Sequence, residues 1–100
     1  MVKLSFCVRL EARPDKAEAV RQFLEDALPL ANDEPGTPYW FAVRLGPTSF
    51  GIFDAFPDEA ARQAHLHGRI AEQLLAHAGE LLSEPPRIEP ADILAAKLPA

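Results

Sequence analysis

The chain has 100 residues, which suits a single domain over 1–100 and leaves no room for a second. Its 15 Asp and Glu outnumber 10 Lys and Arg, giving a formal charge of −5. A nucleic-acid or anionic-membrane partner is therefore not expected, because both bind a basic face. Cys7 is the one cysteine, so no disulfides stabilise the domain. Small domains without disulfides often gain core by oligomerising.

No targeting or membrane segment is predicted. The apolar start of the chain is interrupted by Ser5 and Arg9, and no apolar run approaches the roughly 18 residues of a membrane span. A lone cysteine is usual in a reducing compartment, so a cytoplasmic location is expected. No metal-type cysteine pair and no Gly-rich phosphate loop occurs. The sequence therefore predicts no metal and no cofactor.

The first half of the chain predicts a strand and a helix. Residues 2–11 alternate strictly between apolar and other side chains, which indicates a strand. Apolar residues then recur at steps of three and four, which predicts a helix from Pro14 to about Leu30. Pro29 is expected to bend or end this helix. The segment NDEPGTP, 32–38, is a turn cluster.

The second half predicts a hairpin, further helices and a last strand. Strands are expected at 39–45 and 48–56, joined by a short break. A helix opens at Pro57, is interrupted by Gly68, and continues to the double proline at 85–86. The segment 87–97 is expected to form an edge strand, because it contains a proline.

The resulting β-α-β-β-α-β order is the ferredoxin-like pattern, an α+β fold with helices on one face of a four-stranded antiparallel sheet. The apolar set of the second strand is expected to face the helices with that of the first; it comprises Tyr39, Phe41, Val43 and Leu45. This assignment leaves Trp40, Ala42 and Arg44 on the open face with Phe53. An exposed apolar face is costly in a monomer, so a sheet-to-sheet homodimer is predicted.

Two segments, within this element order, resemble the antibiotic biosynthesis monooxygenase family. They are EPGT before the second strand and FDAFPDEAARQAH after the third. The resemblance covers essentially the whole chain and implies a dimeric α/β barrel. The family includes cofactor-independent oxygenases that act on quinols and polycyclic phenols or anthrones, and relatives that degrade haem.

The resemblance also carries over individual residues. His65 matches a histidine that the family often places near the end of the helix after strand three. Ile70 stands where a second histidine commonly follows. Asp54 matches the acidic residue that frequently ends strand three, and Phe56 matches the aromatic residue after it. The chain thus has the family's element order and part of its polar pattern.

A cofactor-independent monooxygenase needs an apolar pocket, a base and groups that stabilise an anion. The sequence suggests His65 as base or orienting donor, with Asp54 as its partner. Trp40 and Phe53 are the expected pocket walls for a small aromatic quinol- or phenol-like substrate that reacts with molecular oxygen. Arg44 is a candidate for binding an anionic product, or for an ion pair at the dimer interface.

Other interpretations remain open for the same residues. His65 could be a surface or capping histidine near a helix break, and Asp54 a structural acid paired with Arg44 or Arg62. The whole chain could be a non-catalytic dimeric module that binds a hydrophobic metabolite. It could also bind or degrade haem, with His65 or His77 as the axial candidates.

Overall fold

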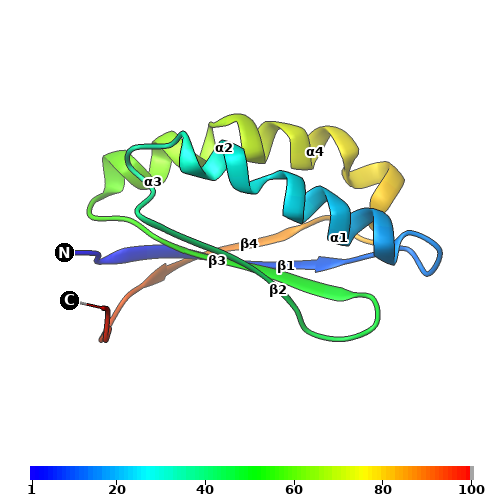
Figure 1. The fold of residues 1–100 in the computed structure, drawn as a ribbon, viewed down its shortest axis with the longest axis horizontal. Coiled ribbons are helices and arrows are strands. Elements are labelled where there is room, and N and C mark those ends of the chain that lie inside the picture. Colours follow the sequence, from blue (N-terminus) through cyan, green and yellow to red (C-terminus); the bar gives the residue numbers. More distant parts are fainter. Residues whose placement is uncertain (100) are drawn as a thin grey trace.

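The helices and strands follow in the predicted order. The structure, a computed structural model, describes residues 1–99. The elements are β1 (Leu4–Glu11), α1 (Ala17–Asp26), α2 (Leu28–Asn32), β2 (Tyr39–Arg44), β3 (Ser49–Ala55), α3 (Glu59–Leu66), α4 (Arg69–Leu81) and β4 (Arg87–Asp92). The strands pair antiparallel in the order β2-β3-β1-β4. All helices cover one face of this sheet (Figure 1). The predicted ferredoxin-like α+β fold is confirmed.

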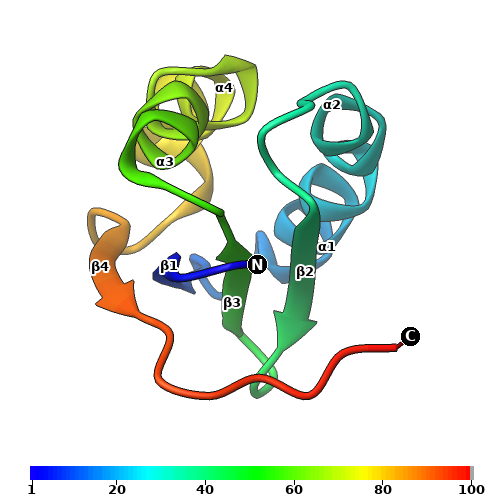
Figure 2. The ribbon, with the colours of Figure 1, turned by 90° about the vertical axis from the view of Figure 1, so that its left-hand side faces the viewer.

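Figure 2 views the two layers end-on, with α1 and α2 over the β2 side and α3 and α4 over the β4 side. The first helical segment divides as predicted, because α1 ends at Asp26 and Pro29 lies in the first turn of α2. A proline fits a first turn, where its missing N–H leaves no bond unmade. Gly68 separates the second pair of helices and is the N-cap residue of α4. No helix in the described part of the chain is both long and apolar enough to cross a membrane.

The core lies between the sheet and the helices. The alternating apolar side chains of β1 face the helices as predicted; Phe6, Val8 and Leu10 are all buried. They pack with Phe50 and Ile52 of β3 and with residues of α1 and α4. Burial of these side chains supplies most of the favourable free energy of folding.

The predicted facing of β2 is wrong by one residue. Phe41 pairs with Phe53, which pairs with Cys7, and this row lies on the open face. The Phe41 and Phe53 side chains are 53% and 44% exposed, and their rings stack with centroids 6.5 Å apart. Trp40 instead packs under the helices. The sequence pattern does not identify the buried face of β2, because apolar residues occur at both its odd-numbered and its even-numbered positions.

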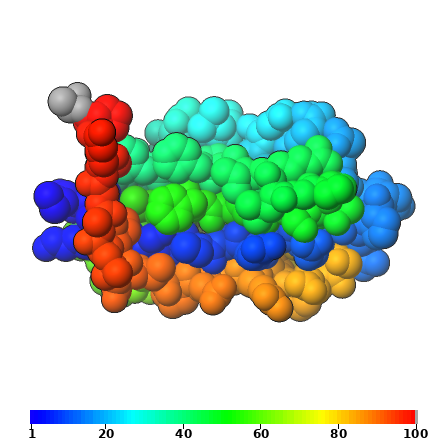
Figure 3. Space-filling model, turned by 90° about the horizontal axis from the view of Figure 1, so that it is seen from below, coloured from blue at the N-terminus to red at the C-terminus, as the bar shows by residue number. Residues whose placement is uncertain are grey.

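The last strand is shorter than predicted, and the chain then crosses the open face. β4 is an edge strand as expected, but it ends at Asp92, which pairs with the first residue of β1, Leu4. This pair is the last of the ladder between β1 and β4. Residues 93–99 turn beneath one end of the sheet toward the β2 side (Figures 2 and 3). The N–H of Ile93 donates to the carbonyl of Lys3 at 2.8 Å.

Candidate functional site

His65 lies in the last turn of α3, and its side chain is buried. The helix begins after Asp58, whose carboxylate accepts a hydrogen bond from the N–H of Ala61 at 2.8 Å. This places the imidazole against the ring of Phe56, with centroids 5.2 Å apart. A buried imidazole requires partners for its ring nitrogens. Both nitrogens of His65 meet carboxylates.

These partners come from two other parts of the chain. Nδ1 of His65 lies 2.5 Å from Oε1 of Glu34, in the loop between α2 and β2, and Nε2 lies 3.2 Å from Oδ2 of Asp54 on β3. Glu34 also accepts a hydrogen bond from the hydroxyl of Thr37 at 2.8 Å. The other oxygen of Asp54 accepts one from the N–H of Phe6 at 2.7 Å. We call Glu34, Asp54 and His65 the His65 cluster.

The charge of His65 depends on two opposing effects. Burial lowers the pKa of the imidazole, but hydrogen bonding and charge attraction to Asp54 and Glu34 raise it by more, so the pKa lies above its usual value. The ring therefore stays protonated to a higher pH than a free imidazole does. When protonated, His65 is a cation held between two carboxylates, and it then has no free ring nitrogen that could accept a proton from a substrate.

A cleft of about 260 Å³ opens beside the cluster, between the α2–β2 loop and the α3–α4 junction. It is lined by Glu34, His65, Thr37, Arg69, Asp33 and a set of small or apolar residues that includes Leu30, Pro35, Ala61 and Ala64. The loop approaches α3 closely at Gly36, where a Cβ atom would lie 3.1 Å from that of Ala61. The cleft thus combines an apolar wall with acidic and cationic groups, a usual composition for a small-molecule site.

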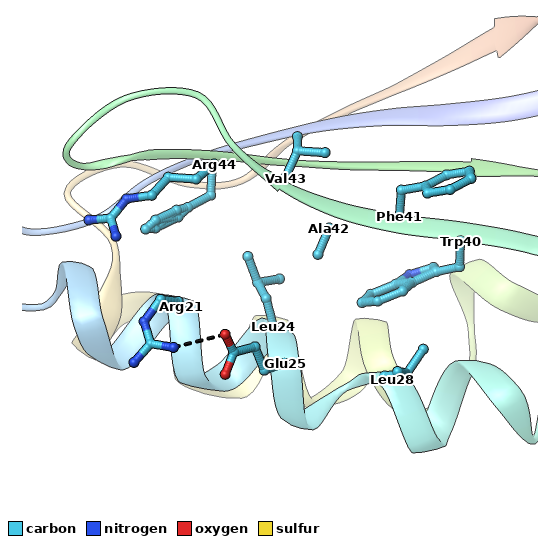
Figure 4. Close-up of a pocket in the computed structure, with 10 residues that line it drawn as sticks. Arg21, Leu24, Glu25, Leu28, Trp40, Phe41, Ala42, Val43 and Arg44 are labelled. Carbon is cyan, nitrogen blue, oxygen red and sulfur yellow. Dashed lines mark hydrogen bonds and ion pairs between the residues drawn. The ribbon is translucent and has the colours of Figure 1, made fainter.

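A second, larger hollow of about 530 Å³ lies between α1 and β2, which we call the groove. Figure 4 shows Trp40 and Leu28 at one end and the Arg21–Glu25 ion pair toward the other. Most of its lining is apolar, and includes Leu24, Leu28, Trp40, Phe41, Ala42, Val43 and Phe50. Arg44 stands at the charged end, where it pairs with Glu18 at 3.2 Å and lies over the ring of Phe50.

The structure brings together some of the predicted site residues and separates others. His65 and Asp54 meet as expected, and Trp40 is the cross-strand neighbour of Asp54 on the helix side of the sheet. Phe53 lies on the opposite face and lines neither the groove nor the cleft, so it does not share a pocket with Trp40. The reason is the alternation of side chains along a strand, which sends adjacent residues of β3 to opposite faces.

Asp54 does not pair with Arg44 or Arg62, the two arginines suggested by the sequence. Arg44 lies in the groove, and Arg62 pairs with Glu59 at 2.6 Å while donating to the carbonyl of Ser5. The carboxylate of Asp54 instead contacts His65 through one oxygen and the N–H of Phe6 through the other.

Sequence reasoning missed Glu34 as a member of the cluster. The sequence predicts a turn at 32–38 and a family resemblance in EPGT, but neither observation assigns a role to the Glu34 carboxylate. Glu34 and His65 are 31 residues apart, so their contact depends on how the loop packs on α3. Within residues 1–99, no group of three or more His, Cys, Asp or Glu side chains is placed to hold a metal ion.

No protein-family model matches the chain, and no curated protein matches it by sequence. Among solved structures, NE2512 from Nitrosomonas europaea, a protein of unknown function, is 60% identical over 100% of this chain and 97% of its own, with a TM-score of 0.97. Rv0793 from Mycobacterium tuberculosis is 20% identical over 94% and 97% of the two chains, with a TM-score of 0.83.

A "putative antibiotic biosynthesis monooxygenase" from Nitrosomonas europaea also has this fold. It is 18% identical over 92% of this chain and 90% of its own, with a TM-score of 0.81. The resemblance inferred from the sequence is thereby confirmed at the level of the fold. The chain belongs to the same family as NE2512 and shares the fold of the antibiotic biosynthesis monooxygenases.

Proposed function

We propose that the protein is a cofactor-independent monooxygenase that oxidises a small aromatic phenol- or quinol-like substrate in the cleft beside His65. The observation that carries this proposal is the His65 cluster at the wall of the cleft: a buried imidazole between two carboxylates, one of which lines the cleft with it. Such an arrangement supplies both a proton acceptor and a cation that stabilises an anion.

The proposed reaction begins with loss of the phenolic proton. Glu34, whose side chain is 20% exposed, accepts the proton, and the imidazolium of His65 and the guanidinium of Arg69 stabilise the phenolate. Asp54 is a positioning residue, since it holds His65 from the interior. The electron-rich phenolate then passes one electron to dioxygen, and the resulting radical pair combines to form a carbon–oxygen bond.

The products balance without a further reductant. Protonation of the new peroxide gives a hydroperoxide on the ring carbon, and loss of water from it leaves a carbonyl. For an anthrone, one CH₂ group and one O₂ become one C=O group and one water. The substrate supplies all the electrons, so the protein needs only to bind, deprotonate and stabilise.

We also infer a homodimer that forms through the open sheet face. The exposed side chains of Phe41, Val43, Leu45 and Phe53 give this face an apolar centre. Covering such a patch with a second copy removes it from water. Sedimentation as a monomer at micromolar concentration would show that this inference is wrong.

A non-catalytic module that binds a hydrophobic metabolite is the second candidate, and the groove favours it. Its lining is mostly apolar, and the guanidinium of Arg44 is already bonded to Glu18 and to the carbonyls of Gly46 and Pro47. A ligand of the groove is therefore expected to be neutral and apolar. Haem is not favoured, because both ring nitrogens of His65 meet carboxylates and His77 lies exposed on α4.

The test is oxygen uptake by metal- and flavin-free protein with a panel of hydroquinones and anthrones. We expect uptake to be lost in His65→Ala and strongly reduced in Glu34→Gln, both checked for folding by circular dichroism. His77→Ala is the matched control, since this exposed histidine is outside the cleft, and should retain full activity. Uptake that is unchanged in folded His65→Ala would remove the cluster from the reaction. No uptake with any substrate, together with saturable binding of apolar dyes that Trp40→Ala abolishes, would favour the binding module.

A further inference from the structure

The helix α4 begins without a side-chain cap. Its N-cap residue is Gly68, whose backbone is extended, with φ −86° and ψ −174°. Ser, Asp, Asn and Thr are preferred at such a position, because their side chains accept hydrogen bonds from the free N–H groups of the first turn. The chain has such a residue at α3, which the side chain of Asp58 caps. Any residue can adopt the backbone conformation of Gly68, so this conformation does not explain the glycine.

The surroundings of Gly68 explain it instead. A Cβ atom on Gly68 would lie 3.2 Å from Oε2 of Glu34, and also 3.2 Å from the carbonyl oxygens of Ala64 and His65. These distances are shorter than the 3.4 Å at which ordinary contacts of a Cβ atom begin. The carbonyl of His65 is held in place, because it accepts a hydrogen bond from the N–H of Gly68 at 3.0 Å. The carboxylate of Glu34 ends a flexible side chain, so it is the group that a side chain at position 68 would displace.

The position of the Glu34 carboxylate decides its contact with His65. Oε1 lies 2.5 Å from Nδ1 of His65 and accepts a hydrogen bond from the hydroxyl of Thr37. Oε2 lies in the space beside Gly68. A carboxylate is planar and rigid, so a displacement of Oε2 also moves or tilts Oε1. The contact between Glu34 and His65 therefore depends on the space beside Gly68.

We propose that Gly68 is a positioning residue for the His65 cluster: the space left by its missing side chain admits the carboxylate of Glu34 to the junction of α3 and α4, where it contacts His65. Gly68 acts through Glu34 and not on the ring itself. Its consequence for catalysis rests on the proposed function, in which Glu34 accepts the phenolic proton. The placement of Glu34 does not depend on that function.

The test is an NMR titration of His65 in the intact protein. Gly68→Ala should lower the pKa of His65, in the same direction as Glu34→Gln, because the carboxylate that raises it is moved away from the ring. Asp54 still faces the other ring nitrogen, so the change reports on Glu34. Gly79→Ala is the matched control. It makes the same substitution on the same helix, where the new methyl meets nothing within 4 Å, and should leave the pKa of His65 unchanged.

Two further variants separate positioning from stability. Gly68→Ser introduces a hydroxyl that can cap α4, which offsets the crowding and provides the test if Gly68→Ala does not fold; it should also lower the pKa of His65. Gly68→Ala added to Glu34→Gln should cause no further fall, because the charge is already absent. An unchanged pKa of His65 in folded Gly68→Ala or Gly68→Ser, or an equal fall with and without the Glu34 charge, would overturn the proposal.

These titrations do not depend on turnover. If the protein takes up no oxygen with any substrate, they still decide whether Gly68 positions Glu34. With a substrate that is oxidised, folded Gly68→Ala should also lose uptake, whereas Gly79→Ala should keep it. A lowered pKa of His65 with full uptake would support the positioning of Glu34 and remove Glu34 from the proton transfer.

Discussion

Replacing Asp54 with Asn should lower the free energy of unfolding by about 2 kcal/mol near pH 6. The amide keeps an oxygen for the N–H of Phe6 but loses the charge that faces His65. Hydrogen bonds to charged groups contribute about 1.5–3 kcal/mol and neutral ones about 0.5–1.5, so the Phe6 bond weakens by about 1 kcal/mol. The lost attraction to His65 adds about 1 kcal/mol. This is less than the 3–5 kcal/mol that is typical when one partner of a buried ion pair is removed, because Glu34 still contacts the ring.

The loss of stability should depend on pH. Because the pKa of His65 is raised by folding, the stabilisation from its proton is complete below the pKa of the unfolded chain and is lost as the pH rises through the pKa of the folded one. Asp54→Asn removes one of the two carboxylates that raise this pKa. The difference in stability between wild type and variant should therefore be larger near pH 6 than near pH 9.

Urea denaturation at both pH values, followed by tryptophan fluorescence, measures this difference. Asp58→Asn is a suitable control, because Asn also caps helices well and the site is exposed; its effect should stay below about 0.5 kcal/mol. Equal stability of Asp54→Asn and wild type near pH 6, or a larger loss near pH 9, would refute the assignment of a charge interaction between Asp54 and His65.

Three further predictions concern the cleft and the sheet. Glu34→Gln should lower the pKa of His65, as measured by NMR titration, since it removes a carboxylate that raises it; an unchanged titration would contradict the contact. Gly36→Ala should destabilise the protein by about 1 kcal/mol because its new methyl would crowd α3. The control Gly79→Ala, whose methyl would meet nothing within 4 Å, should instead stabilise it by about 0.5–1 kcal/mol. Equal denaturation midpoints for both variants would argue against a closely packed loop. The proposed homodimer predicts that the wild type sediments as a dimer and Phe53→Glu as a monomer, and a dimeric variant would place the interface elsewhere.

The element order could be predicted because local signals agree with the fold. Strict alternation over β1 and the breaks at Pro29 and Gly68 depend only on neighbouring residues, and the structure has each of them. The end of β4 could not be predicted in this way. It depends on pairing with β1, where Asp92 is paired with Leu4, and pairing between strands distant in the sequence cannot be predicted from neighbouring residues.

The candidate site was only partly predictable for the same reason. His65 and Asp54 were identified because the residue types and the resemblance agreed, but their mutual contact and the contact with Glu34 arise from packing between α3, β3 and a loop. The prediction of which β2 side chains face the helices was wrong because Trp40 and Phe41 are both large and apolar. Which of the two enters the core is decided by the register with β3.

The position of Cys7 makes the open sheet face accessible to chemistry. Its thiol is exposed in the middle of β1, opposite Phe53, and it is the one cysteine of the chain. A maleimide reagent therefore labels a single known point, and the labelling rate reports whether this face is covered: rapid in a free subunit and slow when two subunits associate. Oxidation of the same thiol to a sulfinic or sulfonic acid would put a charged group beside the aromatic pair, so the proposed homodimer should dissociate more readily once Cys7 is oxidised.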